Sequence, residues 1–138
     1  MQPSTVLLID DDDDLRLLAR VALEHDARFV VVGEGSNGLE AISMASDLKP
    51  ALILLDLEMP WLEGAEAVPH LRRNDPTARI VLWTVDPYGA RANDALSLGA
   101  DAVLDKATVS PRRIGDELDA IVASTVAPPP EPDRRAGA

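Results

Sequence analysis

The sequence contains no cysteine and has few basic residues. Without cysteine, a disulfide scaffold, a zinc–thiolate site and thiol-based catalysis are all excluded. Thirteen Lys and Arg stand against 24 Asp and Glu, which leaves a formal net charge of −11. An acidic surface repels nucleic-acid phosphates and anionic lipid headgroups, so we expect no direct binding of nucleic acid or membrane by this chain.

Long apolar runs and a glycine-rich nucleotide motif are missing as well. No run approaches the roughly 20 apolar residues that a membrane-spanning helix needs. The first apolar run, residues 6–9, is too short for a secretory signal and leads directly into aspartates. Since neither a membrane span nor a secretory signal is found, we expect a cytoplasmic protein. Gly33 and Gly35 alone are too sparse for a dinucleotide-binding fingerprint.

Short apolar runs alternate with longer amphipathic ones along the 138 residues, a length that fits one domain. Strands that lack polar–apolar alternation and are separated by helices predict an α/β fold, with a parallel sheet covered by helices on both faces. The expected strands are residues 6–9, 29–33, 51–55, 79–84 and 100–105. The expected helices are residues 14–24, 38–48, 65–73, 88–98 and 111–124.

Several details of these elements are predicted from single residues. Asp13 or Asp14 is the expected N-cap of the first helix. Leu39 is expected to face inward, and Pro69 is expected in the first turn of a helix that starts late. From residue 127 the composition becomes proline-rich, so residues 127–138 are expected to form a disordered tail or linker.

Four of the predicted strands deliver polar groups at their C-terminal ends. Asp10 and Asp11 follow the first strand, Asp56 the third, Thr84 closes the fourth, and Lys106 follows the fifth. In open parallel α/β sheets this edge is where ligands bind. An acid pair, an acid, a hydroxyl and an amine together can hold a divalent cation and a phosphoryl group.

The order of these motifs resembles the receiver domain of two-component response regulators, over roughly residues 5–126. The domain itself is expected to span residues 1–126. The stretch at residues 32–41 further resembles receivers that precede helix-turn-helix domains, although we expect no such output domain in this chain. The motifs that carry the resemblance are Leu8-Ile9-Asp10-Asp11, Leu54-Leu55-Asp56-Leu57-Glu58-Met59-Pro60 with Gly64, Thr84 after Ile80–Trp83, and Gly99-Ala100-Asp101 with Lys106.

The resemblance implies a flavodoxin-like sheet of five strands in the order 2-1-3-4-5. It implies that Asp56 is the phosphoacceptor, and that Lys106 and Thr84 contact the phosphoryl oxygens. It also implies a Mg²⁺ ion, whose expected ligands are Asp10, Asp11, Asp56 and the backbone carbonyl of Glu58. Oxygen ligands of this kind suit that hard cation.

The implied function is a phosphorylation-dependent switch rather than an enzyme with turnover of its own, beyond self-catalysed phosphotransfer and autodephosphorylation. The phosphodonor would be a histidine kinase or a phosphotransfer protein. Phosphorylation would change the surface formed by the helix at 88–98 and the strand at 100–105. That surface would control a partner protein or output domain, with homodimer formation on phosphorylation as one outcome.

Several residues depart from the receiver pattern. Val103 replaces the usual aromatic residue, Ala107 replaces the proline after Lys106, and the branched Val85 follows Thr84. Glu58 and Asp86 add carboxylates at the rim of the predicted site. We expect these changes to alter the switching and the lifetime of the phosphoryl group rather than to abolish them.

Other interpretations remain open beside this one. The chain can be a pseudo-receiver, an interaction module that works without phosphorylation. A haloacid-dehalogenase-type phosphatase is disfavoured, because it would need an Asp where Glu58 stands and also a cap domain. The Asp10–Asp14 run can simply cap a helix, and Thr84 and Lys106 can be an ordinary strand residue and an ordinary surface residue.

Three further residues are expected to have no part in the site chemistry. His25 and His70 are expected on the surface. Trp61 is expected either to contact a partner or to pack its loop.

Overall fold

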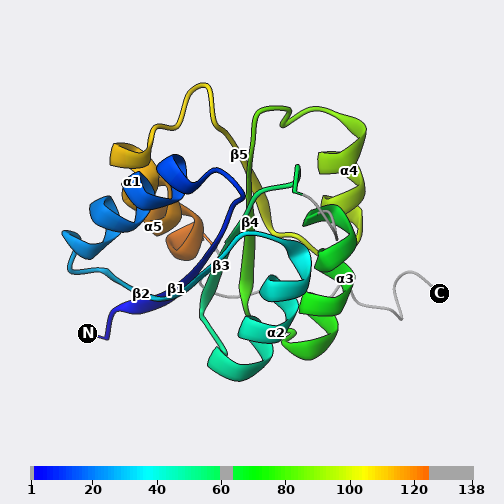
Figure 1. The fold of residues 1–138 in the computed structure, drawn as a ribbon, viewed down its shortest axis with the longest axis horizontal. Coiled ribbons are helices and arrows are strands. Elements are labelled where there is room, and N and C mark those ends of the chain that lie inside the picture. The colour runs from blue at the N-terminus through cyan, green and yellow to red at the C-terminus, as the bar shows by residue number, and fades with distance from the viewer. Residues whose placement is uncertain (1, 60–63, 125–138) are drawn as a thin grey trace, which may run out of the picture.

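The computed structural model describes residues 2–59 and 64–124. Within them, five parallel strands form one sheet in the order β2-β1-β3-β4-β5 (Figure 1). The strands are β1 (Ser4–Ile9), β2 (Phe29–Gly35), β3 (Leu52–Leu55), β4 (Arg79–Thr84) and β5 (Ala102–Asp105). The predicted fold class and strand order are confirmed.

Helices cover both faces of this sheet (Figure 1). On one face lie α1 (Asp13–Glu24) and α5 (Ile114–Ser124), the latter preceded by a short 3-10 helix, η1 (Pro111–Arg113). On the other lie α2 (Gly38–Leu48), α3 (Gly64–Asn74) and α4 (Ala90–Ser97). Among the described helices, none is long and apolar enough to cross a bilayer.

Alternate strand residues supply the two halves of the core. In β1, Leu7 and Ile9 pack in the cluster that contains the buried residues of α2, α3 and α4. Val6 and Leu8 pack in the cluster that contains those of α1 and α5. Because both faces are buried, both sets of positions must be apolar, which explains the absence of polar–apolar alternation.

The register of the central strands brings their C-terminal ends to one edge. Ile9 lies opposite Leu55, and Leu55 lies opposite Leu82. The residues that follow these positions therefore meet at the same edge of the sheet.

The strand and helix ends differ from the predicted ones by a few residues. β1 begins at Ser4, because Ser4 pairs with Phe29, and β2 extends to Gly35, which pairs with Ile9. α4 begins at Ala90 rather than at Tyr88, whose side chain is 88% exposed. The end of α4 at a glycine was predicted, and Gly99 adopts a φ of +127° there.

The prediction that α3 starts late was wrong. The helix begins at Gly64, so Pro69 lies inside it, beyond the first turn. Proline has no backbone N–H, and α3 therefore lacks the hydrogen bond to the carbonyl of Ala65. Val68 and Leu71 are fully or almost fully buried against the sheet, and this burial outweighs the missing bond.

Two predictions about helix faces and caps were also wrong. The N-cap of α1 is Asp12, whose carboxylate accepts from the amides of Asp14 and Leu15. In α2, Leu39 is 60% exposed, whereas the small residues Ala41 and Ala45 face the core, the latter as one of the predicted inward positions.

Some predictions fall outside the described residues. They concern Trp61 and the proline-rich segment 127–138, and they stay predictions. The predicted end of the receiver domain at residue 126 also lies outside the described residues and stays a prediction.

Candidate functional site

The strand ladders place two acidic side chains next to each other. Asp10 follows β1, and its amide donates to the carbonyl of Gly35 at 3.0 Å. Asp56 follows β3, and its amide donates to the carbonyl of Ile9 at 2.9 Å. These bonds continue the pairing of the strands by one residue, so the two carboxylates leave the sheet side by side. Both residues are buried, at 4% and 3% exposure.

Asp11 completes a cluster of three carboxylates. One oxygen each of Asp10, Asp11 and Asp56 lies within 4.8 Å of the others. Asp11 is exposed, whereas the other two are buried, so the cluster opens to solvent on the Asp11 side. The sequence-based prediction that these acids meet at one edge is confirmed as geometry.

Lys106 brings a positive charge into the cluster from the end of β5. Its Nζ lies 2.8 Å from Oδ2 of Asp10 and 3.4 Å from Oδ1 of Asp56. Its own amide donates to the carbonyl of Thr84 at 2.9 Å, which fixes the backbone from which the side chain departs. Burial opposes the charged amine, but the contacts with Asp10 and Asp56 outweigh it and raise the pKa of Lys106.

The pKa of Asp56 is raised to about 7. Burial is the main cause, and the charge of Asp10 adds to it. Lys106 and the amide of Glu58, which donates to Oδ1 of Asp56 at 3.3 Å, act in the opposite direction. The cluster is therefore short of positive charge when its acids are ionised.

The donor set fits a divalent cation. Oδ1 of Asp10 accepts from the amide of Asp12 at 2.9 Å. Oδ2 of Asp10 is buried and has no hydrogen-bond partner among the described residues, where it lies 2.8 Å from Nζ of Lys106 in an ion pair. A buried carboxylate oxygen with unused lone pairs, beside two further carboxylates, suits the all-oxygen coordination of Mg²⁺.

Glu58 and Thr84 are each linked through their backbone to a residue of the site, Glu58 to Asp56 and Thr84 to Lys106. Thr84 is fully buried at the end of β4, and its hydroxyl oxygen accepts from the amide of Asp86 at 3.1 Å. The side chain of Glu58 is exposed. Val85 is 62% exposed, and Val103 is partly buried in the core.

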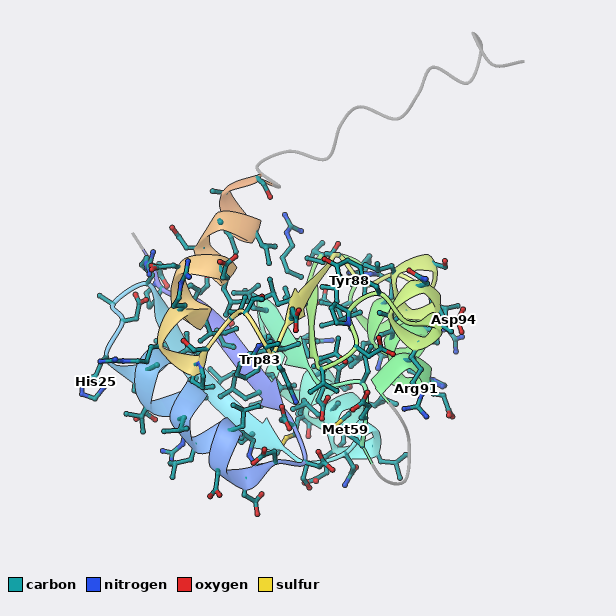
Figure 2. The ribbon with its side chains drawn as sticks, turned by 90° about the horizontal axis from the view of Figure 1, so that it is seen from above. His25, Met59, Trp83, Tyr88, Arg91 and Asp94 are labelled. Atoms are coloured by element: carbon teal, nitrogen blue, oxygen red, sulfur yellow. The ribbon has the colours of Figure 1, made fainter. Side chains whose placement is uncertain are left out.

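Gly64 was named in the sequence motif, but its contact and those of Arg16 and Trp83 were not predicted. A Cβ on Gly64 would lie 2.1 Å from the carbonyl oxygen of Asp56, so only glycine fits against the backbone of the Asp56 loop. Arg16 of α1 donates to the backbone carbonyl of Asp10. Trp83 lies in the interior (Figure 2), and Nζ of Lys106 is 5.7 Å from the centre of its ring.

The two histidines lie away from the acidic cluster. His25 lies at the periphery (Figure 2), and both His25 and His70 are exposed. Their predicted surface positions are confirmed.

Comparison with known proteins agrees with this geometry. The sequence matches the family model of the response regulator receiver domain over residues 6–119. The nitrate/nitrite response regulator protein NarL of Escherichia coli (strain K12) is 41% identical over 105 residues, which cover 76% of this chain and 49% of NarL. A protein-glutamate methylesterase/protein-glutamine glutaminase of Geobacter sulfurreducens is 36% identical over 116 residues, which cover 83% of this chain and 30% of that protein. The chain thus matches about half, or less, of the length of these relatives.

Solved structures show the same fold. The response regulator domain of Thermotoga maritima CheB superposes with a TM-score of 0.79 at 29% identity, covering 92% of this chain and 99% of that one. The signal receiver domain of a NarL response regulator from Mycobacterium tuberculosis gives 0.78 at 26% identity, covering 88% and 98%. Fold, strand order and family match together show that this chain belongs to the response regulator receiver domain family of two-component signalling.

Proposed function

We propose that the chain is a phosphorylation-dependent switch in which Asp56 accepts a phosphoryl group from a phosphohistidine. The observation that carries the proposal is the meeting of the Asp10, Asp11 and Asp56 carboxylates with the Lys106 ammonium at one edge of the sheet. The donor would be a histidine kinase or a phosphotransfer protein.

In the proposed transfer, a carboxylate oxygen of Asp56 attacks the phosphorus. A P–O bond forms while the P–N bond of the phosphohistidine breaks, and the electron pair of that bond stays on the imidazole nitrogen, which takes up a proton. The Lys106 ammonium, 3.4 Å from Asp56, contacts a phosphoryl oxygen and neutralises part of its charge. Positioning and charge stabilisation of this kind account for most catalysis of phosphoryl transfer.

Asp10, Asp11, Asp56 and the backbone carbonyl of Glu58 would hold Mg²⁺. The ion, when bound, supplies the positive charge that lets an anionic phosphoryl group approach an anionic carboxylate. Asp10 would contribute its buried Oδ2, which has no hydrogen-bond partner among the described residues, and Asp11 would contribute a ligand from the exposed side of the cluster.

Thr84 would transmit the modification to the surface. Its hydroxyl oxygen accepts from the amide of Asp86, and donation by the same hydroxyl to a phosphoryl oxygen would draw it away from that amide. The loop between β4 and α4 would then change, and with it the face formed by α4 and β5. This is a population shift driven by a local charge event.

Phosphorylation would act through other proteins in the cytoplasm. The altered face would control a partner protein or an output domain, and a homodimer formed on phosphorylation is one such complex. The chain would have no turnover beyond its own phosphotransfer and autodephosphorylation, and it would work in the cytoplasm without binding nucleic acid or membrane itself.

Binding of beryllofluoride, which mimics a phosphoryl group on a carboxylate, tests this proposal. The expected result is a change in tryptophan fluorescence that needs Mg²⁺ and disappears in Asp56→Asn, because Trp83 lies close to Lys106. A wild-type protein that gives no change, while remaining folded by circular dichroism, would favour a pseudo-receiver instead.

A further inference from the structure

Arg16 reaches the acidic cluster from α1, although the proposed chemistry does not use it. Its side chain is only 18% exposed. The guanidinium donates to the backbone carbonyl of Asp10 at 2.5 Å, to the carboxylate of Asp13 at 2.8 Å and to Oε1 of Glu34 at 3.2 Å. One planar group therefore joins α1, the loop after β1 and the strand β2.

The bond to the Asp10 carbonyl restrains both acids of the loop. That carbonyl belongs to the rigid peptide plane that links Asp10 to Asp11. Fixing its oxygen fixes the rotation of the plane, and thus the directions in which the two side chains leave the backbone. The amide of Asp12, which donates to Oδ1 of Asp10, holds the carboxylate of Asp10 from the other side.

The guanidinium is itself held in place from the sheet. Glu34 of β2 accepts from Arg16 through Oε1 and pairs with Nε of Arg20 through Oε2 at 2.9 Å. Arg16 also lines a small cavity together with Asp10, Asp56 and Trp83, so its side chain borders the interior of the site. A planar fork fixed at three points orients its partner better than a flexible ammonium would.

We propose that Arg16 is a positioning residue of the metal site: by holding the Asp10 carbonyl it keeps the carboxylates of Asp10 and Asp11 directed toward Asp56, and so sets the affinity for a divalent cation. This inference rests on the proposed function, because it takes the acid cluster to be a cation site. It adds a residue that touches neither the cation nor the phosphoryl group.

Electrostatics and positioning predict effects of opposite sign, which makes the inference testable. Arg16 is a cation, so its charge alone weakens Mg²⁺ binding, and removing that charge would tighten it. Loss of an orienting partner instead weakens metal binding, typically 10- to 100-fold. Arg16→Lys keeps the charge and loses the fork, whereas Arg16→Ala loses both.

The experiment is a Mg²⁺ titration of the whole chain, followed by tryptophan fluorescence, with thermal melting as a check on folding. Arg16→Lys and Arg16→Ala are expected to raise the Kd for Mg²⁺ about tenfold or more. Arg20→Ala is the matched control, because Arg20 is a neighbouring arginine that also pairs with Glu34 but does not bond Asp10; its Kd is expected to stay within about twofold of the wild type. If Arg16→Ala does not fold, Arg16→Lys decides alone.

Four other results of this titration would overturn the inference. An unchanged Kd in Arg16→Lys overturns the positioning role, and so does an Arg20→Ala variant that is weakened as much as the Arg16 variants. A wild type that does not bind Mg²⁺, or a response that survives in Asp11→Asn, overturns the metal site of the proposed function and the inference with it.

Discussion

Asp56 is buried next to Asp10, and its ionisation therefore opposes folding. The pKa of Asp56 is raised to about 7, mainly by burial and then by Asp10, against about 3.9 for an unfolded aspartate. Between these values the folded protein binds a proton that the unfolded chain has lost. The contribution of this group to stability is therefore present below about pH 4 and is lost as the pH rises toward 7.

Replacing Asp56 by Asn should consequently stabilise the fold in the absence of Mg²⁺. The full shift is discounted, because Lys106 and residual hydration screen the charge, and we expect a gain of about 2 kcal/mol in the free energy of unfolding at pH 8. The gain should shrink toward zero near pH 4. Urea denaturation at several pH values in EDTA measures it, with the exposed Asp86→Asn as control. A gain that increases on acidification would contradict this explanation.

Gly64 is the second residue whose identity the site requires. A Cβ there would also lie 2.9 Å from Cα of Leu57, so the contact is with backbone that has no freedom to move away. Gly64→Ala should therefore cost about 2–3 kcal/mol of stability and disturb the Asp56 loop.

Gly115→Ala is the control for this substitution. Its Cβ would lie 2.6 Å from Oδ2 of Asp26, which is the far end of a flexible side chain. Thermal melting of both variants compares them, and equal losses would show that the Gly64 contact has no special role.

Among the single residues of the site, those that follow the strands could be predicted from the sequence, whereas those that hold them in position could not. Asp10, Asp56 and Lys106 were predictable because each follows an apolar run, and parallel strands bring such positions together. Arg16 gave no comparable signal, because a basic residue on a predicted helix is usually a solvated one. Its role depends on contacts with a loop and with β2 that only the folded chain creates.

Among the helices and strands, α1 has an N-cap that is hard to predict, because a run of aspartates precedes it. Any aspartate between Asp10 and Asp14 satisfies the N-cap preference. The structure selects Asp12, because Asp10 is committed to the acid cluster and Asp12 accepts from the amides of Asp14 and Leu15. The predicted cap was therefore displaced by one residue or two.

Asp12→Ala is expected to lower the free energy of unfolding by about 1 kcal/mol, because two amides of the first turn lose their acceptor. Asp14→Ala removes an acid from the same turn without removing the cap, and it should cost at most about 0.5 kcal/mol. Urea denaturation without Mg²⁺ compares the two. The assignment of the cap would be wrong if Asp14→Ala were the more costly change.

The errors in α2 and α3 have one physical cause. Helix amphipathicity and proline rules describe an isolated segment, whereas these helices are placed by packing on the sheet. α2 turns Ala41 and Ala45 inward, which leaves Leu39 in solvent, and the burial of Val68 and Leu71 keeps α3 continuous through Pro69. Tertiary burial overrides local preference in both.

For the whole molecule, the parallel sheet followed from strands that lack alternation, since both of its faces are buried. The strand order could not be derived from the residues in the same way, because it depends on pairings between distant segments. It came from the resemblance to receiver domains, and the observed order β2-β1-β3-β4-β5 confirms it. Three of the many acidic residues, Asp10, Asp11 and Asp56, meet at the edge of the sheet where the cation is proposed to bind.

If this acidic edge makes Asp56 a phosphoacceptor, incubation with acetyl phosphate and Mg²⁺ should change the intact mass of the chain. We expect the gain of one phosphoryl group, which is absent without Mg²⁺ and absent in Asp56→Asn. A folded wild-type protein that gains no phosphoryl group, or an Asp56→Asn variant that gains one equally well, would contradict it.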